Sequence, residues 1–333
     1  MADQTVRAIY LSHPRGLSER AVREVRAVPG LDLVEDETWP SMSPEQLADR
    51  VRAFDVLLLS RGPALPDALA ESPGKLRHIC YLHGSVRQSI GLPIIRAGIT
   101  VTNWGDAAGT GLAMGSLVLL QASLLDLHKR IMAVRRGGSR GFNSVGGTVT
   151  GLRVGVYGYG FAGREFVRLA RALGAEVRIF DPYASDFPDD CTRVPSLEAL
   201  FDGAQAIVIH AGLTPETTGS VTAALLARLP DQGVVVNTAR GAIIDQDALF
   251  AELKAGRLRA GLDVLSPDEL PEDHEARTWE NLIWTCHRFL GGGWPGDDSL
   301  GRRDENLLTN LRAVVDGRPL QFVIDEQRYH LMT

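Results

Sequence analysis

Cysteine is scarce in this sequence, and its spacing suits neither a metal site nor a disulfide framework. Three cysteines occur in 333 residues, and they lie far apart, at Cys80, Cys191 and Cys286. An odd number of cysteines without a C-x-x-C pair predicts neither structural zinc nor a set of disulfides. We therefore expect a fold that depends on its hydrophobic core, with no metal.

Basic charge and long apolar runs are scarce as well. The formal net charge is -6, which offers no basic surface for nucleic acid or an anionic membrane. The most apolar stretch, 112–127, is interrupted by Gln121 and Asp126 and is shorter than the roughly 20 apolar residues of a membrane helix. The N-terminus lacks a basic segment followed by an apolar one, so no signal peptide is expected. These absences predict a cytoplasmic protein without nucleic-acid or membrane partners.

The sequence does contain two series of short, β-branched apolar runs that alternate with amphipathic segments. The chain is long enough for two domains of roughly 100–200 residues each. Near-continuous apolar strands that alternate with helices are typical of parallel sheets covered on both faces, so the predicted class is α/β. The expected strands are 6–11, 56–60, 78–82 and 99–103 in the first series, and 153–158, 176–181, 206–210, 233–238, 259–264 and 282–286 in the second.

Two helical segments bear on the domain organisation. A long helical stretch from about Gly109 to Val134 separates the two series and is expected to be an interdomain helix, followed by a loop rich in Gly and Ser at 135–151. The tail at 299–317 also has helical periodicity. If the tail packs on the first domain, that domain is discontinuous, but periodicity alone leaves this open.

A nucleotide motif opens the second series. Gly158, Gly160 and Gly163 have the G-x-G-x-x-G spacing between a predicted strand and a predicted helix. The glycines permit a tight turn and close approach of a pyrophosphate, while the helix N-terminus supplies N–H groups and a positive dipole end. Asp181, at the end of the next strand, is placed to accept the ribose hydroxyls. It would repel a 2′-phosphate, so NAD is favoured, although Arg178 keeps NADP open.

Further motifs follow in a fixed order, and together they carry a resemblance. The stretches HAGLTPETTGSV (210–221), NTARGAIIDQDAL (237–249), AGLDVLSPDELP (260–271) and WTCHRFLGGG (284–293) follow the nucleotide motif. With it, they resemble the D-isomer-specific 2-hydroxyacid dehydrogenase family over most of residues 78–293.

The resemblance implies a domain plan and a reaction. It implies two Rossmann-like, doubly wound parallel-sheet domains with the active site in the cleft between them. The substrate-binding domain would comprise 1–103 plus 296–333, and the NAD-binding domain 104–295. The reaction would interconvert a D-2-hydroxy acid and a 2-oxo acid with NAD as cofactor, in a homodimer.

The resemblance also assigns three catalytic roles, which the chemistry supports. Arg240 would bind the carboxylate and carbonyl of the substrate, because a guanidinium is a rigid two-pronged donor. His287 would be the acid/base, since the alkoxide left by hydride transfer must take a proton. A carboxylate from 265–271 would orient the histidine and stabilise its protonated ring. Taken alone, a histidine at a strand end is more often a structural residue, and an arginine before glycine in a turn is usually a surface charge. The motifs found together in this order favour the catalytic roles.

The sequence leaves open which carboxylate pairs with His287. The family usually has Glu then Pro where this chain has Asp268 then Glu269. Counting five residues from Asp263 leads to Asp268, whose side chain is one methylene shorter. Asp268 is the predicted partner, and Glu269 is the alternative if the loop is shifted by one residue.

Further contacts are implied by the resemblance alone. The substrate loop lies at 82–91, and its backbone N–H groups would hold the substrate carboxylate. There Arg87 either meets a second anionic group or is a solvated surface residue. The predicted substrate-binding residues are His83, Gly84, Ser85, Val86, Arg87 and Arg240. The predicted cofactor-binding residues are Gly158, Tyr159, Gly160, Phe161, Ala162, Gly163, Asp181, His210, Thr217, Thr238, Ala239, Arg240, Asp263 and His287.

Some departures from the family pattern keep other functions open. The usual VAE of the interdomain helix is LAM at 112–114, and Cys286 replaces the proline before the histidine. The lost acid favours an NAD(H)-sensing, corepressor-like binding protein, whereas the retained Arg240 and His287 favour an enzyme. A dehydrogenase of another small anion, such as one like formate or phosphite, is a further alternative on the same scaffold.

Overall fold

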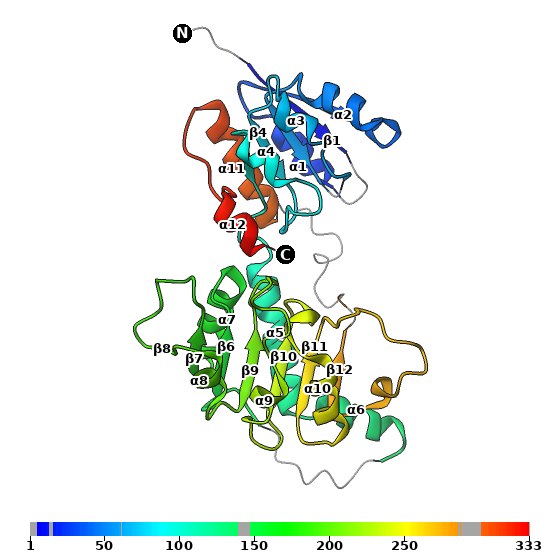
Figure 1. Cartoon of the computed structure of the whole chain (residues 1–333), viewed down its shortest axis with the longest axis vertical. Coiled ribbons are helices and arrows are strands. Elements are labelled where there is room, and N and C mark those ends of the chain that lie inside the picture. The colour runs from blue at the N-terminus through cyan, green and yellow to red at the C-terminus, as the bar shows by residue number, and fades with distance from the viewer. Residues whose placement is uncertain are drawn as a thin grey trace. The chain divides into compact units, whose positions relative to one another are not determined.

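The computed structural model describes residues 5–12, 16–60, 62–138, 147–285, 287 and 301–332. The chain divides into two compact units (Figure 1). Unit 1 comprises Met1–Ala108 and Gly293–Thr333, and unit 2 comprises Gly109–Gly292. Unit 1 is therefore discontinuous in sequence, and its first segment ends a few residues beyond the predicted boundary at 103. The second predicted boundary, at 295, lies outside the described residues.

Unit 1 is built on a five-stranded parallel sheet with the order β2-β1-β3-β4-β5. Four of the strands confirm the predicted runs. The edge strand β2 was not predicted, because acidic residues break its apolar pattern and only its first and last residues are buried. The strands are β1 (Val6–Leu11), β2 (Leu31–Asp36), β3 (Val56–Leu59), β4 (His78–Tyr81) and β5 (Thr100–Thr102).

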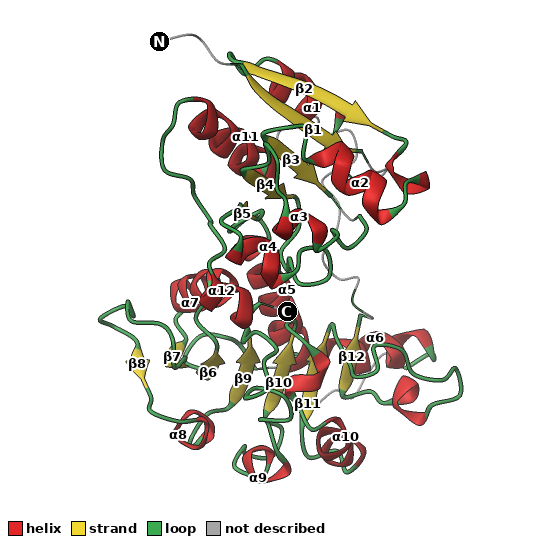
Figure 2. Cartoon of the chain, turned by 45° about the horizontal axis from the view of Figure 1, so that its top comes forward, coloured by secondary structure: helices red, strands yellow, loops and turns green. Residues whose placement is uncertain are grey.

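Helices cover both faces of this sheet (Figure 2). On one face, Leu307, Leu308 and Leu311 of α11 pack against Ala8 and Tyr10 of β1. The C-terminal tail therefore returns to the first sheet, which periodicity had left open. The elements are α1 (Glu19–Arg26), a 3-10 helix (Trp39–Ser41), α2 (Pro44–Val51), α3 (Ala68–Glu71), α4 (Leu92–Arg96), α11 (Arg302–Val315) and α12 (Glu326–Leu331).

Unit 2 is built on a seven-stranded parallel sheet with the order β12-β11-β10-β9-β6-β7-β8. The chain starts at β6, adds β7 and β8 on one side, and then adds β9 to β12 on the other. Doubly wound sheets bind ligands where this order reverses, which here is between β6 and β9. The strands are β6 (Arg153–Tyr157), β7 (Glu176–Phe180), β8 (Thr192–Arg193), β9 (Ala206–Ile209), β10 (Val234–Asn237), β11 (Arg259–Leu262) and β12 (Leu282–Trp284).

The seven-stranded sheet is also covered on both faces, which confirms the predicted α/β class. Figure 2 shows α8, α9 and α10 along one face, while α5 and α7 lie on the other. The helices are α5 (Gly109–Leu124), α6 (Leu127–Arg135), α7 (Phe161–Ala172), α8 (Leu197–Phe201), α9 (Ala223–Leu226) and α10 (Gln246–Lys254). Two 3-10 helices span Gly241–Ile243 and Glu275–Thr278.

The prediction of one long helix from Gly109 to Val134 was wrong, because α5 and α6 are separated by a bend of 61°. At the break, Asp126 adopts a left-handed conformation with φ 49°. The guanidinium of Arg259 donates to the carbonyl oxygens of Ser123 and Leu124 and contacts the carboxylate of Asp126. The carbonyl groups that a helix leaves unpaired at its end thus find a partner, so α5 can stop there.

No single helix within the described ranges has the length and apolar composition of a membrane span. Among the helix pairs of the described segments, α5 and α6 taken together, across their bend, pass that test.

Candidate functional site

The glycine loop between β6 and α7 has the shape that a dinucleotide needs. Gly158 has φ 98°, and a Cβ there would overlap the backbone of Ala211, while a Cβ on Gly163 would overlap the carbonyl group of Gly158. A Cβ on Gly160 would meet no described atom within 4 Å, so the loop is open at this point. Gly160 is also the N-cap of α7, and no side chain of a described residue caps this helix. The backbone therefore fits a pyrophosphate at Gly160 and at the start of α7.

Asp181 lies directly after β7 and faces the same loop. Its Oδ2 accepts the N–H of Tyr159 at 2.6 Å, and its Oδ1 accepts those of Tyr183 and Ala184 at 2.8 and 3.0 Å. These bonds fix the carboxylate beside the glycine loop and leave lone pairs for ribose hydroxyls. The guanidinium of Arg178 donates to the carbonyl oxygen of Asp202, so this arginine is engaged with the backbone.

The loop after β9 carries two of the predicted cofactor residues. His210 has its Nε2 buried with no hydrogen-bond partner among the described residues. Burial lowers the pKa of His210 to about 4, so its imidazole is neutral at physiological pH. Thr217 donates its hydroxyl to the carbonyl oxygen of Gly212 and accepts the N–H of Thr214. Thr217 therefore shapes the loop through its side chain.

The turn after β10 places Arg240. The Asn237 side chain accepts the N–H of Ala239 and donates to the carbonyl oxygen of Arg240, which closes the turn. Thr238 is buried and hydrogen-bonds to Ser116 of α5 at 2.7 Å. The Arg240 side chain donates to the carbonyl oxygen of Ala239. Burial lowers the pKa of its guanidinium, and the charge of Asp268 opposes this shift.

A close backbone approach brings the Arg240 turn to the loop that follows β11. A Cβ on Gly241 would overlap the backbone of Leu265, so only glycine fits where the two segments touch. Leu265 in turn donates its N–H to Oδ1 of Asp268 at 3.3 Å. The turn after β10 and the loop after β11 are therefore packed together at the carboxyl edge of the sheet.

Asp268 and His287 are brought into contact. The distance from Oδ2 of Asp268 to Nδ1 of His287 is 3.0 Å. A carboxylate only accepts hydrogen bonds, so Nδ1 carries the proton and Nε2 is the ring nitrogen left for a substrate. The other acid that the sequence left open, Glu269, is exposed and makes no ion pair with any described residue. Of the two candidates, the loop thus presents Asp268 to the histidine.

The backbone of His287 is held in an uncommon conformation. Its φ is 56°, a left-handed value that is rare for residues with a Cβ and that clusters at functional sites. Its N–H donates to the carbonyl oxygen of Asp263 in a short hydrogen bond. Cys286, which replaces the proline of the family pattern, lies outside the described residues.

Two polar residues in contact with this region were not predicted from the sequence. The hydroxyl of Thr285 donates to Oδ1 of Asp263 at 2.6 Å, and Asn237 closes the Arg240 turn. Asp263 is only 4% exposed, so the hydroxyl satisfies a buried carboxylate. Their place in the sequence could have pointed to them, because each of the two residues lies within three positions of a predicted site residue.

The predicted substrate loop follows β4 in unit 1. Asn103 donates its side-chain N–H to the carbonyl oxygen of Gly84 at 2.6 Å, and the Trp104 ring lies against Gly84. His83 is 3.3 Å from the hydroxyl of Ser60. Ser85 has its hydroxyl buried without a partner among the described residues. The contacts of Asn103 and Trp104 fix the loop at Gly84.

The rest of that loop is tied to the core and to the C-terminal segment of unit 1. Val86 is fully buried in the core. Arg87 donates to the carbonyl oxygen of Met332 at 3.0 Å. The Arg87 side chain is exposed, which agrees with the alternative of a surface residue, and its guanidinium binds the C-terminal segment of the unit.

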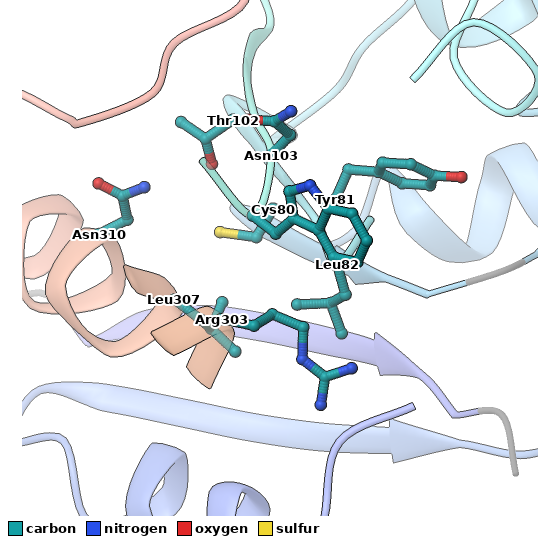
Figure 3. A pocket seen from close by; sticks show the side chains of 9 residues that line it. Cys80, Tyr81, Leu82, Thr102, Asn103, Arg303, Leu307 and Asn310 are labelled. Carbon is teal, nitrogen blue, oxygen red and sulfur yellow. The ribbon is translucent and has the colours of Figure 1, made fainter. Parts of the chain in front are cut away.

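Unit 1 also contains a small pocket that includes none of residues 83–87 (Figure 3). Cys80, Thr102 and Asn103 line one side, and Asn310 lies on the opposite side. Burial raises the pKa of the Cys80 thiol to about 12, so it is no nucleophile. Within the described residues no cluster of potential metal ligands occurs.

Comparisons with known proteins agree with this geometry. The model of the D-isomer specific 2-hydroxyacid dehydrogenase NAD-binding domain matches residues 117–288, more than half of the chain. The glycerate dehydrogenase of Methylorubrum extorquens is 27% identical over 86% of this chain and 90% of its own length. The D-3-phosphoglycerate dehydrogenase of Methanocaldococcus jannaschii is 28% identical over 76% of this chain. The match covers only 49% of that relative, so the chain spans about half of its length.

Among solved structures, D-2-hydroxyisocaproate dehydrogenase aligns over 96% of this chain and 99% of its own, with a TM-score of 0.76 at 18% identity. That likeness shows the shared two-domain fold. The match of the family model covers the glycine loop, Asp181, Arg240, Asp268 and His287. The chain belongs to the D-isomer specific 2-hydroxyacid dehydrogenase family and contains the NAD-binding domain of that family.

Proposed function

We propose that this protein is an NAD-dependent oxidoreductase that interconverts a D-2-hydroxy acid and a 2-oxo acid. The observation that carries the proposal is the contact of Asp268 with Nδ1 of His287, which leaves Nε2 for a substrate. Arg240 lies near enough to Asp268 for their charges to interact. An acid/base, its orienting carboxylate and a cation for the substrate thus occur together in unit 2.

Unit 2 fits an NAD cofactor through its own backbone. The open Gly160 and the uncapped start of α7 suit a pyrophosphate, and Asp181 suits the ribose hydroxyls. When bound, the nicotinamide ring supplies or accepts the hydride. Asp263 and His210 remain the predicted neighbours of the cofactor, and the neutral ring of His210 adds no charge there.

His287 carries the proton step. In the reductive direction, protonated Nε2 donates to the carbonyl oxygen as negative charge develops there, and in the oxidative direction neutral Nε2 removes the hydroxyl proton. Asp268 accepts from Nδ1 throughout, which holds the ring orientation and stabilises the imidazolium.

Arg240 binds the anionic end of the substrate. Two parallel N–H groups of a guanidinium match a carboxylate and can also polarise the adjacent carbonyl. The loop at 83–87 in unit 1 remains a predicted second site for the substrate carboxylate.

The substrate class is a small 2-oxo acid or its D-2-hydroxy counterpart. Proteins similar to this chain include a glyoxylate reductase and two hydroxypyruvate reductases, whose names both denote reduction of a small 2-oxo acid. The test is oxidation of NADH and of NADPH across a panel of 2-oxo acids, with His287→Ala as control. We expect turnover with NADH for at least one acid and its loss in the variant. Tight NADH binding without turnover of any acid would contradict the enzyme proposal and support the sensor alternative.

We also propose that the protein is a cytoplasmic homodimer. Large apolar side chains are exposed along α5 and α6, and α6 has no buried residue. The exposed residues are Met114, Val118, Leu125, Leu127, Ile131 and Val134. Such a stripe on a surface suits association with a second copy. Sedimentation velocity should give a dimer, and Ile131→Glu should shift it toward monomer; a wild-type monomer would contradict the proposal.

A further inference from the structure

Asp268 and His287 form their contact from two exposed positions. Each side chain is 49% exposed, and each lies beyond the end of its strand. An exposed pair of this kind contributes little free energy to hold its own geometry. Something else must therefore fix the loop that carries Asp268 against the strand that leads to His287.

Arg277 contacts both of these segments. It lies in the 3-10 helix Glu275–Thr278. Its Nε donates to the carbonyl oxygen of Pro271 at 2.8 Å, and its Nη2 donates to that of Leu270 at 2.6 Å. Its Cζ also lies 5.1 Å from the centroid of the Trp284 ring. One guanidinium thus holds the backbone two and three residues after Asp268 and lies over an aromatic ring three residues before His287.

The two anchor points of Arg277 are themselves fixed. Leu270 is buried and belongs to the same core cluster as Ala276 and Leu282. Trp284 ends β12 and pairs with Leu262 of β11. Its buried Nε1 has no hydrogen-bond partner among the described residues, and the guanidinium of Arg277 lies over its ring. Because one anchor is packed in the core and the other belongs to a strand of the sheet, the guanidinium joins the Asp268 loop to the His287 strand.

We propose that Arg277 is a positioning residue that sets the contact between Asp268 and His287. This inference rests on the proposed function, since it assigns Arg277 to the acid/base pair of that reaction. A guanidinium is suited to the task because its planar fork reaches two carbonyl groups while its face covers a ring. A lysine retains the charge and one hydrogen bond, so it should replace Arg277 only in part.

The test is a double-mutant cycle with Asp268→Asn. We expect Arg277→Met to lower kcat for reduction of the 2-oxo acid by about tenfold, as for a misplaced catalytic group, with KM for NADH unchanged. Arg277→Lys should lie between Arg277→Met and wild type. In the Asp268→Asn background, Arg277→Met should have no further effect. The proposal would be overturned if Arg277→Met left kcat unchanged. It would also be overturned if Arg277→Met lowered kcat by the same factor in the Asp268→Asn background.

Arg257→Met is the matched control for a general loss of structure. Arg257 also donates to two carbonyl oxygens, those of Leu226 and Leu229, and it lies in the same unit. Its variant should keep the wild-type kcat and pH profile. The pH profile of kcat/KM should move in Arg277→Met toward that of Asp268→Asn. The charged groups that the structure shows beside His287 are Asp268, which contacts Nδ1, and Arg240, whose charge interacts with that of Asp268.

A second measurement decides the matter without turnover. Two-bond ¹H–¹⁵N spectra of the histidine rings report the tautomer of His287, which His287→Gln assigns. In Arg277→Met the His287 signals should move toward those of Asp268→Asn, while those of Arg257→Met should match wild type. If the proposed function fails but these signals move, the positioning role stands by itself. If they stay at the wild-type position, Arg277 has no such role.

Discussion

The carboxylate of Asp268 lies 3.0 Å from Nδ1 of His287, although the two residues are 19 positions apart in sequence. They follow β11 and β12, which are neighbouring parallel strands. Segments that leave neighbouring parallel strands emerge at the same edge of a sheet. The topology therefore brings this pair together, and the loop conformation selects which acid meets the ring.

Replacement of Asp268 by Asn should impair the proton step. We expect kcat to fall by about a hundredfold or more, because the amide cannot stabilise the imidazolium. Reduction needs the protonated ring, so the alkaline limb of its pH profile should move to lower pH. Steady-state kinetics from pH 5 to 9 measure both effects. Glu269→Gln is the control and should behave as wild type; the opposite result for the two variants would mean that the loop is shifted by one residue.

Arg240→Lys tests whether a two-pronged donor is needed. An ammonium group keeps the charge but cannot hold the carboxylate and polarise the carbonyl at once. We expect kcat/KM for the 2-oxo acid to fall by about 10²–10³-fold. NADH affinity, measured by fluorescence titration, should change little. Retention of full activity in the lysine variant would show that Arg240 acts only as a charge.

Much of the fold could be predicted, because the buried strands of both sheets appear in the sequence as continuous apolar runs. The limits of these predictions were physical. The edge strand β2 is acidic and half-buried, so it lacks the run that marks a central strand. The break between α5 and α6 depends on Arg259, which lies more than 130 positions away in sequence. A contact of that kind leaves no trace in local periodicity.

The site could be predicted in part for a similar reason. The glycine motif and Asp181 are local patterns with fixed spacing, so the sequence placed them on the right turns. The choice between Asp268 and Glu269 depended on a loop in which a shift of one residue exchanges the two acids. Arg277 could not be predicted, because its contacts require the folded course of the chain from Leu270 to Trp284.

The glycine loop allows a pair of substitutions that separates folding from cofactor binding. Gly160 has ordinary backbone angles and open space at its Cβ position, so Gly160→Ala should fold normally. Its methyl group would occupy the approach of the pyrophosphate, and NADH affinity should fall at least about tenfold. Gly163→Ala would instead overlap the Gly158 carbonyl and should lower the melting temperature too. Wild-type NADH affinity in Gly160→Ala would contradict this placement of the cofactor.

Asp181 should govern the choice between NADH and NADPH. Its carboxylate is fixed by three backbone N–H groups, so a 2′-phosphate would meet an immobile negative charge. We expect Asp181→Ser to lower kcat/KM with NADH about tenfold. The ratio of kcat/KM with NADH to kcat/KM with NADPH should therefore fall. The measurement is kcat/KM with both cofactors. An unchanged ratio in the variant would show that another group sets the preference.

The buried histidine of unit 1 predicts a pH dependence of stability. Burial lowers the pKa of His78 from its ordinary value of 6.5 to about 4, while Nδ1 bonds to the carbonyl oxygen of Thr100. Between these values the unfolded chain binds a proton that the folded protein does not, so stability is lost as pH falls from about 6.5 toward 4. Between pH 7 and pH 5, protonation of this histidine in the unfolded chain should lower the free energy of unfolding by about 2 kcal/mol. Urea unfolding at both pH values should show this loss in wild type and a smaller loss in His78→Gln, whose side chain does not titrate; equal losses in the two proteins would refute the assignment.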